Sequence, residues 1–163
     1  MSDKTAMTAA EIRIEAAEFR RVLGSYPTGV CAITAMIESG PCVMVVGSFS
    51  SVSLDPPLIG FFPGRQSNSW RQIESAGRFC VNVLGSHQFA LSQQFAASGS
   101  DKFAGISYSL SAGGAPIIDE AIAWIDCDMY SVTEAGDHYF VLGRVTSLDV
   151  VGEGAPLVFH RGR

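Results

Sequence analysis

A predicted long β-hairpin near the end of the chain constrains the fold more than any other feature of the sequence. Apolar and acidic residues alternate between positions 121 and 133, which is the two-residue period of a β-strand. One face would carry the apolar side chains, and the other would carry Asp126 and Asp128. The sequence Glu-Ala-Gly-Asp at 134–137 predicts a turn into a second strand at 138–150. These two runs predict an antiparallel fold made mainly of β-strands.

Shorter apolar or β-branched runs extend this pattern along the chain. We expect further strands at residues 29–36, 42–47, 58–62, 79–84 and 156–160. Three helices are expected, and the first follows a capping box at 8–11, carries Phe19, Val22 and Leu23 on one face and ends near Tyr26. The other two are expected at 69–74 and 86–96. The predicted fold class is therefore mainly β: a small antiparallel β-barrel with about three peripheral helices.

Composition limits the kinds of partner that the protein can have. The 163 residues are enough for one domain, and a net charge of −5 argues against nucleic-acid binding. No run approaches the roughly 18 apolar residues that span a membrane, and no signal peptide opens the chain, so we expect a cytoplasmic protein that does not enter the membrane. Hydrophobic residues make up 47% and charged residues 17%, which suggests apolar surface hidden in an oligomer or around a ligand.

Four cysteines occur too far apart for a disulfide framework or a zinc motif, so no metal site is predicted. They are expected to be small buried apolar residues: Cys31, Cys42, Cys80 and Cys127.

A serine-rich segment, GSFSSVSLDPPLIGFF at 47–62, is the first candidate binding site. It must be extended before Pro56, and it would present hydroxyls and backbone N–H groups toward one side. Such a surface suits a ligand rich in hydrogen-bond acceptors, such as a flavin ring edge or a ribityl phosphate. The alternative is a turn in which the serines bond to their own backbone.

A helix start near residue 69 is the second candidate. Ser69 and Gln72 form a possible capping box with Arg65 just before it, and helix N-termini bind phosphate. The alternative is an ordinary N-cap with a solvated arginine.

Gly136-Asp-His138 at the start of a predicted strand is the third candidate. His138 would share a strand face with Phe140, Leu142 and Arg144, and the alternative is a structural or solvent-exposed histidine. The sequence contains no nucleophile elbow, paired carboxylates, HExxH helix, GxGxxG or P-loop motif. No side chain is therefore assigned a catalytic role, and an enzyme of this kind must rely on a cofactor.

Six motifs together resemble the flavin-reductase-like FMN-binding domain family. The resemblance runs from about Phe19 to the last residue, and its motifs are PTGV at 27–30, SFSSVSLDPP at 48–57, FCVNVL at 79–84, KF at 102–103, GDH at 136–138 and PLVFHRG at 156–162. It implies one domain over residues 1–163, with a disordered N-terminus at 1–7, that forms a split β-barrel homodimer. It also implies hydride transfer from NADH or NADPH to FMN or FAD, with FMN slightly favoured. Reduced flavin would then diffuse to a partner flavin-dependent monooxygenase, for which this protein is the reductase component.

The resemblance also implies the residues of the site. Flavin-binding positions would be Thr28, Ser48, Phe49, Ser50, Ser51, Ser53, Pro57, Ser67, Ser69, Cys80, Val81, Asn82, Lys102 and Phe103. His138 and Arg161 would contact the nicotinamide nucleotide, with His138 as a positioning residue. The chain has Val43 and Val45 where the family usually has Gly and Thr, and Gly47 replaces a common Asn or Ser, which would weaken some flavin contacts.

Two other functions are compatible with the sequence. One is a flavin-binding protein for electron transfer or storage without NAD(P)H turnover, and the other is an enzymatically inert barrel that serves as an interaction subunit.

Overall fold

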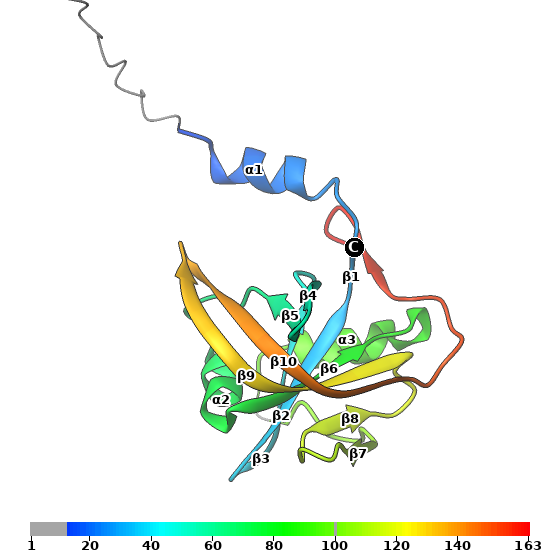
Figure 1. The fold of residues 1–163 in the computed structure, drawn as a ribbon. Coiled ribbons are helices and arrows are strands. Elements are labelled where there is room, and N and C mark those ends of the chain that lie inside the picture. Colours follow the sequence, from blue (N-terminus) through cyan, green and yellow to red (C-terminus); the bar gives the residue numbers. More distant parts are fainter. Residues whose placement is uncertain (1–12, 100) are drawn as a thin grey trace, which may run out of the picture.

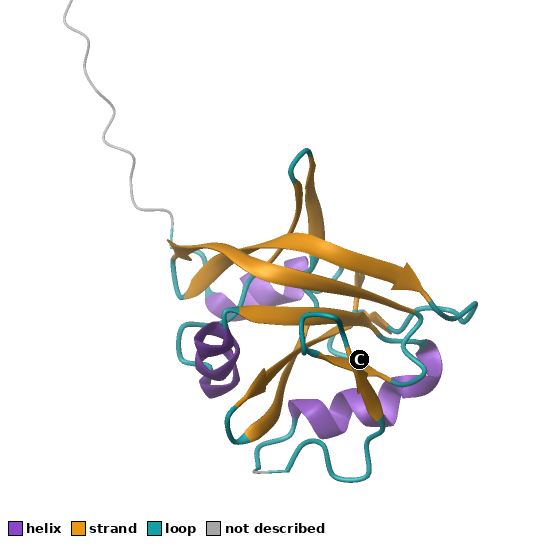
Figure 2. Cartoon of the chain, turned by 60° about the horizontal axis from the view of Figure 1, so that its bottom comes forward, coloured by secondary structure: helices purple, strands orange, loops and turns teal. Residues whose placement is uncertain are grey.

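The computed structural model describes residues 13–99 and 101–163, and every strand pairing in it is antiparallel. The main sheet has seven strands in the order β3-β2-β6-β9-β10-β5-β4. Their bounds are β2 Cys31–Ile37, β3 Gly40–Val46, β4 Ser50–Leu54, β5 Pro57–Phe61, β6 Arg78–Val83, β9 Ala123–Ala135 and β10 His138–Val150. The prediction of a mainly β, antiparallel fold is confirmed, and Figure 2 shows the helices lying around a body of strands.

The predicted long hairpin forms the centre of this sheet. Strands β9 and β10 pair from Ala135 opposite His138 down to Ala123 opposite Val150. Two irregularities interrupt the register, at Leu142/Gly143 and at Val145/Ser147. An added Cβ at Gly143 would lie 2.5 Å from the Phe79 ring, so glycine lets β10 approach the core there.

The two aspartates of this hairpin share a face, as the alternation predicted, since Arg78 reaches both Asp126 and Asp128. Asp126, however, is only 1% exposed. A two-stranded ribbon that the sequence did not reveal, β7 (Tyr108–Leu110) with β8 (Pro116–Ile118), has its connecting turn against this carboxylate. Alternation showed which side chains share a face, but it could not show that another segment covers that face.

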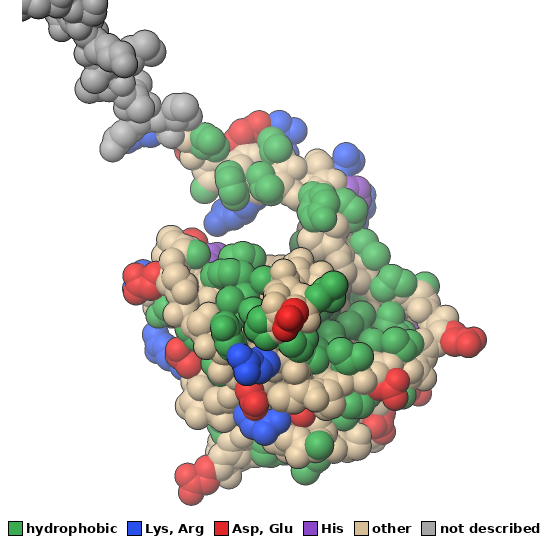
Figure 3. Space-filling model, viewed as in Figure 1, with side chains coloured by type: hydrophobic (Ala, Val, Ile, Leu, Met, Phe, Trp, Pro, Cys, Tyr) green, Lys and Arg blue, Asp and Glu red, His purple; other side chains and the backbone are tan. Residues whose placement is uncertain are grey.

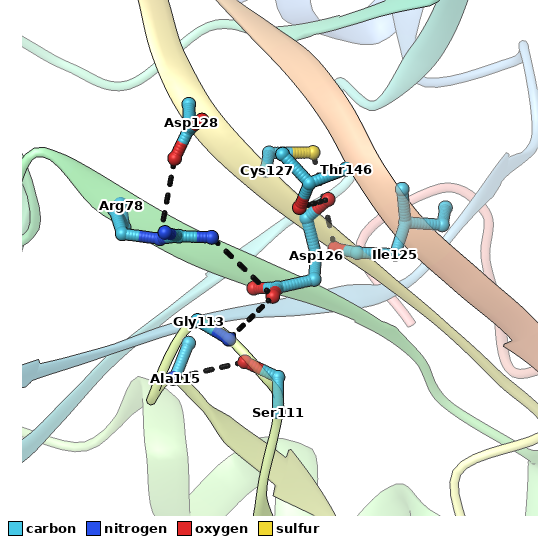
Figure 4. Close-up of polar contacts among 9 residues, drawn as sticks. All are labelled: Arg78, Ser111, Gly113, Ala115, Ile125, Asp126, Cys127, Asp128 and Thr146. Atoms are coloured by element: carbon cyan, nitrogen blue, oxygen red, sulfur yellow. Dashed lines mark hydrogen bonds and ion pairs between the residues drawn. The ribbon is translucent and has the colours of Figure 1, made fainter.

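The buried carboxylate ties the ribbon to the sheet (Figure 4). Asp126 Oδ2 accepts the Gly113 N–H at 3.1 Å and lies 3.7 Å from the Arg78 guanidinium. Arg78 Nε also lies 3.2 Å from Asp128 Oδ1, so one arginine joins two carboxylates. Within the turn, the Ser111 hydroxyl accepts the Ala115 N–H at 3.0 Å.

The main hydrophobic core shows that the sheet curls. Phe61 of β5 and Cys42 of β3 belong to one buried cluster although their strands stand far apart in the strand order. Trp70 and Ile73 of helix α2 (Asn68–Ala76) fill this cluster, and the Phe61 and Trp70 rings meet edge to face at 5.8 Å. The described strands do not close into a ring, because β3 and β4 end the sheet without pairing to each other.

The helices agree with prediction in number but differ at their ends. Helix α1 spans Ala16–Leu23, and the capping box predicted at 8–11 lies outside the described residues. Helix α2 begins at a different cap from the one expected: Ser67 accepts the Trp70 N–H at 3.1 Å, so the predicted capping box at Ser69 is wrong by two residues. The third predicted helix begins as a 3₁₀ turn at Ser86–Gln88 and continues as α3 (Phe89–Ala96).

The chain ends meet outside the main sheet. Strand β1 (Thr28–Gly29) pairs with β11 (Val158–Phe159), which makes the predicted closing strand shorter and places it in a separate ribbon. Helix α1 precedes this ribbon and projects from the body (Figure 1). None of the helices in the described part of the chain has the length and hydropathy needed to cross a bilayer.

Candidate functional site

Two hollows follow one another along the edge strand β3. The first, about 550 Å³, is lined by Cys42 and Val43 of β3 together with Ser69, Lys102 and Phe103. The second, about 440 Å³, lies at the end of β3 and is lined by residues that include Val45, Gly47, Phe89, Leu157 and Arg163. Because β3 pairs only with β2, its other edge leaves backbone groups unpaired beside both hollows.

The first hollow brings together three of the predicted flavin residues. Lys102 Nζ lies 3.4 Å from Ser69 Oγ, beside the first turn of α2. The Gln94 amide holds the backbone of this loop by donating to the Lys102 carbonyl at 3.0 Å, and Phe103 packs against Phe95 with the ring centroids 5.4 Å apart. Lys102 is the only lysine among the described residues. A half-buried ammonium next to a hydroxyl and a helix start can bind a phosphate.

The glycine at position 47, where the family commonly has Asn or Ser, is explained by the closeness of Thr28. A Cβ at Gly47 would lie 2.7 Å from the Thr28 hydroxyl, so a larger side chain would have to displace Thr28. Thr28, another predicted flavin residue, thus occupies the space that an Asn or Ser side chain would need.

The other two departures face a second, smaller core. Val43 is 1% exposed and packs in a buried cluster with Phe95 and Leu84, and the half-buried Val45 packs against the same cluster. These valines make the wall of β3 apolar where the family usually has a hydroxyl.

The serine segment is extended, as predicted, and forms strand β4 on the opposite edge of the sheet. The Ser48 hydroxyl accepts the Phe62 N–H at 3.0 Å, and Ser50 donates to the Ser51 carbonyl at 3.1 Å. Ser51 is exposed and Ser53 is half-buried, with a register shift between them. The segment therefore combines an exposed edge with the local bonds of a serine-rich turn.

Several predicted flavin residues have structural roles in this chain. Phe49 packs against the main core, Pro57 begins β5, and the Ser67 hydroxyl caps α2. Three others are fully buried in β6: Cys80, Val81 and Asn82.

The Asn82 amide is committed to internal bonds. It donates to the Ala32 carbonyl at 3.2 Å and to the Thr34 hydroxyl at 3.0 Å, and its Oδ1 accepts the Ile118 N–H at 2.8 Å. These bonds attach β8 to the sheet. Because β6 also pairs on both sides, neither its side chains nor its backbone are placed to reach a ligand in this chain.

His138 is exposed at the start of β10, and its Nδ1 lies 2.7 Å from Asp137 Oδ1. This hydrogen bond is the main cause that lowers the pKa of the Asp137 carboxyl. The predicted alternation along β10 is observed, since Tyr139 and Val141 belong to the main core while Phe140 lies on the other face.

An aromatic pair that sequence analysis missed lies on this same face. The Phe140 and Phe62 rings stack with centroids 4.9 Å apart and an interplanar angle of 18°. Phe62 is 43% exposed, and its N–H is the donor to Ser48, so the pair joins the serine segment to the His138 strand. Only the pairing of β5 with β10 reveals this contact.

Arg65 lies elsewhere than expected. Its guanidinium pairs with Glu134 at 3.1 Å and donates to the Gly136 carbonyl at 3.4 Å, which directs it toward the β9–β10 turn. It is also 5.7 Å from the Tyr139 ring centroid. The arginine therefore supports the turn that carries His138, and its phosphate role at the helix start stays a prediction.

Arg161 lies in the C-terminal tail, and its N–H donates to the Gly24 carbonyl at 3.0 Å. Among the described residues, no group of three or more His, Cys, Asp or Glu side chains is arranged to hold a metal ion.

Comparison with known proteins identifies the family. Residues 23–163 match the family model for the flavin reductase like domain. A flavin reductase of Pseudomonas putida is 55% identical over 158 residues, covering 94% of this chain and 93% of that protein. The reductase subunit HsaB of a flavin-dependent monooxygenase from Rhodococcus jostii is 43% identical over 150 residues, covering 92% of this chain and 77% of that protein.

Solved structures agree in fold. Nitrilotriacetate monooxygenase component B from Mycobacterium thermoresistibile has a TM-score of 0.87 and 46% identity, covering 90% of this chain and 83% of that one. The NADH:FAD oxidoreductase SgcE6 of Streptomyces globisporus, in complex with NAD and FAD fragments, has a TM-score of 0.85 and 32% identity, covering 90% and 89%.

The chain belongs to the flavin reductase like domain family, so the resemblance predicted from its motifs is confirmed. It is an oxidoreductase of the NAD(P)H:flavin type that uses a flavin and a nicotinamide nucleotide.

Proposed function

We propose that this chain binds flavin in the groove formed by the two hollows along β3, reduces it with NAD(P)H, and releases it to a separate monooxygenase. The observation that carries this proposal is the half-buried Lys102 ammonium 3.4 Å from Ser69, at the polar end of the groove, which Asn68, Gln72 and Asp101 also line. Release to a partner is supported by relatives that are named reductase subunits of flavin-dependent monooxygenases.

The residues of the groove fit a flavin. Lys102 and Ser69 would hold the phosphate, and Thr28 with the backbone from Gly47 to Ser51 would border the ring system. FMN is favoured over FAD because a single ammonium matches a single phosphate. Cys80, Val81 and Asn82 are not among the proposed flavin contacts, since they are buried and the Asn82 amide is hydrogen-bonded inside the core.

When bound, the flavin accepts the hydride of the reduced nicotinamide. The side chains around it bind and orient, and orientation of two reactants can lower a barrier by up to about 7–11 kcal/mol. His138, fixed by Asp137, would position the nicotinamide end of the nucleotide. The Phe62–Phe140 stack would exclude water from the same face.

We further propose a homodimer with the split-barrel architecture. Large apolar side chains are exposed in this single chain, among them Leu54 at 96%, Val150 at 74% and Leu148 at 62%. Soluble monomers rarely leave so much apolar surface uncovered. The curled open sheet around one core supports the split barrel, and sedimentation at micromolar concentration tests the dimer. Four buried thiols are compatible with the cytoplasmic location that we propose.

One assay tests the activity: oxidation of NADH and of NADPH by the purified protein, with and without added FMN or FAD. We expect oxidation that depends on added flavin, and transfer of the reduced flavin across a dialysis membrane to an oxygen-consuming acceptor. A protein that keeps its flavin and shows no dependence on added flavin would contradict free release. No oxidation with either nucleotide would contradict the reductase assignment.

A further inference from the structure

Three strands present an apolar surface on the side of the sheet away from the main core, here called the β4–β10 face. The Phe62 and Phe140 rings stack on it, and Val52 of β4 lies beside them, with Val52 47% and Phe62 43% exposed. Gly60 of β5 keeps the face flat, since a Cβ there would lie 2.7 Å from the Phe140 ring and 3.2 Å from Val52. The solvent side of an antiparallel sheet is normally polar, so this apolar one needs a cover.

Helix α1 is a second apolar surface without a partner. Phe19, Val22 and Leu23 share one side of it and are 54%, 51% and 53% exposed, and none of its eight residues is buried by the described part of the chain. Isolated helices shorter than roughly 12–15 residues are marginal in water, so this helix needs packing to persist. It projects from the body with open space beneath it (Figures 1 and 3), so its own chain does not supply that packing.

The charges around the two surfaces are complementary. The last turn of α1 carries Arg20 and Arg21. The β9–β10 turn, which borders the β4–β10 face, carries Glu134 and Asp137 with side chains 67% and 96% exposed. A basic apolar helix therefore matches an apolar face with an acidic border. Both surfaces belong to one chain, so two copies related by a twofold axis can each cover both surfaces of the other.

We propose that α1 is an arm exchanged between two copies of this chain, and that each arm packs on the β4–β10 face of the other copy. This inference rests on the homodimer and on the nicotinamide position at His138 that are proposed above. His138 precedes Phe140 by two residues on β10, so the two side chains share a face of that strand. The arm of the second copy thus completes the wall of the nicotinamide site, which a monomer leaves open to solvent.

Cysteine cross-linking tests the exchange independently of activity. The double variant Phe19→Cys/Val52→Cys places one thiol on the arm and one on the β4–β10 face, while the four native cysteines are buried. Treatment at pH 7 with a short bis-maleimide, which tolerates small differences in register, should give a covalent dimer on a denaturing gel. Neither single variant should give one, because the two arms and the two faces are each held apart.

Removing the apolar surface of the arm tests what it contributes. Phe19→Ala/Leu23→Ala keeps good helix formers and should raise the dimer Kd, measured by sedimentation, about a hundredfold. The KM for the reduced nucleotide should rise about tenfold where this variant is monomeric, and it should return to the wild-type value as the protein concentration is raised. The matched control Glu18→Ala, on the charged side of the same helix, should change neither constant.

Four results would overturn the proposal. A link formed within one chain would show that α1 folds back on its own body, and no link in the double variant would place the arm away from the β4–β10 face. An unchanged dimer Kd in Phe19→Ala/Leu23→Ala would show that the arm does not hold the dimer. A raised dimer Kd with the same KM at every protein concentration would show that the arm is no part of the nicotinamide site. Failure of the reductase assignment is distinct, because cross-linking and sedimentation do not depend on NAD(P)H oxidation.

Discussion

Replacing Lys102 with methionine tests whether the first hollow binds the flavin phosphate. Methionine keeps the packing of the side-chain stem and removes the ammonium, so the substitution isolates the charge. A charge-assisted hydrogen bond contributes about 1.5–3 kcal/mol, and the half-exposure of Lys102 favours the lower end of that range. About 1.5 kcal/mol corresponds to a roughly tenfold rise in the Kd for FMN.

Riboflavin provides the internal comparison because it has the same ring system and no phosphate. Titration of both flavins by fluorescence quenching should give a Lys102→Met protein that binds FMN about tenfold more weakly and riboflavin as before. Arg71→Met, which removes a cation from the exposed surface of α2 close to Ser69, controls for long-range charge and should leave both affinities nearly unchanged. Equal weakening of FMN and riboflavin in Lys102→Met would refute the phosphate assignment and make the lysine a structural residue.

Three other perturbations test separate parts of the molecule. His138→Ala should raise the KM for the reduced nucleotide about tenfold with an unchanged FMN Kd; a hundredfold fall in kcat would point to proton donation instead. The same variant removes the main cause of the lowered pKa of Asp137, so carboxyl NMR should show that pKa rising toward its ordinary value. Because the pKa of Asp137 is lowered in the folded protein, its small stabilisation is present above the unfolded pKa and is lost as the pH falls through the folded pKa. If the pKa of Asp137 were the same in His138→Ala and in the wild type, the hydrogen bond between the two side chains would be contradicted. Arg78→Ala leaves the buried Asp126 carboxylate with only the Gly113 N–H, and should lower the free energy of unfolding in urea by about 2 kcal/mol. The control Arg71→Ala, at an exposed site on α2, should cost less than about 0.5 kcal/mol. Burial raises the pKa of Cys31 and Cys80 to about 12 and that of Cys42 to about 11, and it raises the pKa of Cys127 as well. None of the four thiols should therefore react with a thiol reagent at pH 8 until the protein is unfolded. Rapid reaction of the native protein would show that the core opens.

Local patterns in the sequence predicted most of the helices and strands, though not the β7–β8 ribbon, and they identified the family. Alternation over 121–133 with a turn at 134–137 predicted the β9–β10 hairpin, because side-chain period and turn chemistry are properties of neighbouring residues. The serine segment was correctly expected to be extended before Pro56. The order of short motifs identified a flavin reductase.

Tertiary structure decided which of these residues can meet a ligand. Asn82 belongs to one of the quoted motifs, yet its amide is consumed by Ala32, Thr34 and Ile118, which come from two other strands. The alternation placed Asp126 on one face with Asp128, but it could not show that the β7–β8 ribbon buries that carboxylate. Burial depends on what packs over a face, and that information is spread over segments far apart in the sequence.

The arginines show the same division most clearly. Sequence could place Arg65 beside a helix start, but its guanidinium binds Glu134, which lies 69 residues away along the chain. Arg78 gave no signal either, because its partners Asp126 and Asp128 lie on another strand. The sequence by itself determined the class of fold and of chemistry, since both follow from local pattern and motif order. Only the tertiary structure determined which charges pair and which are buried, because both depend on segments that are far apart in the sequence.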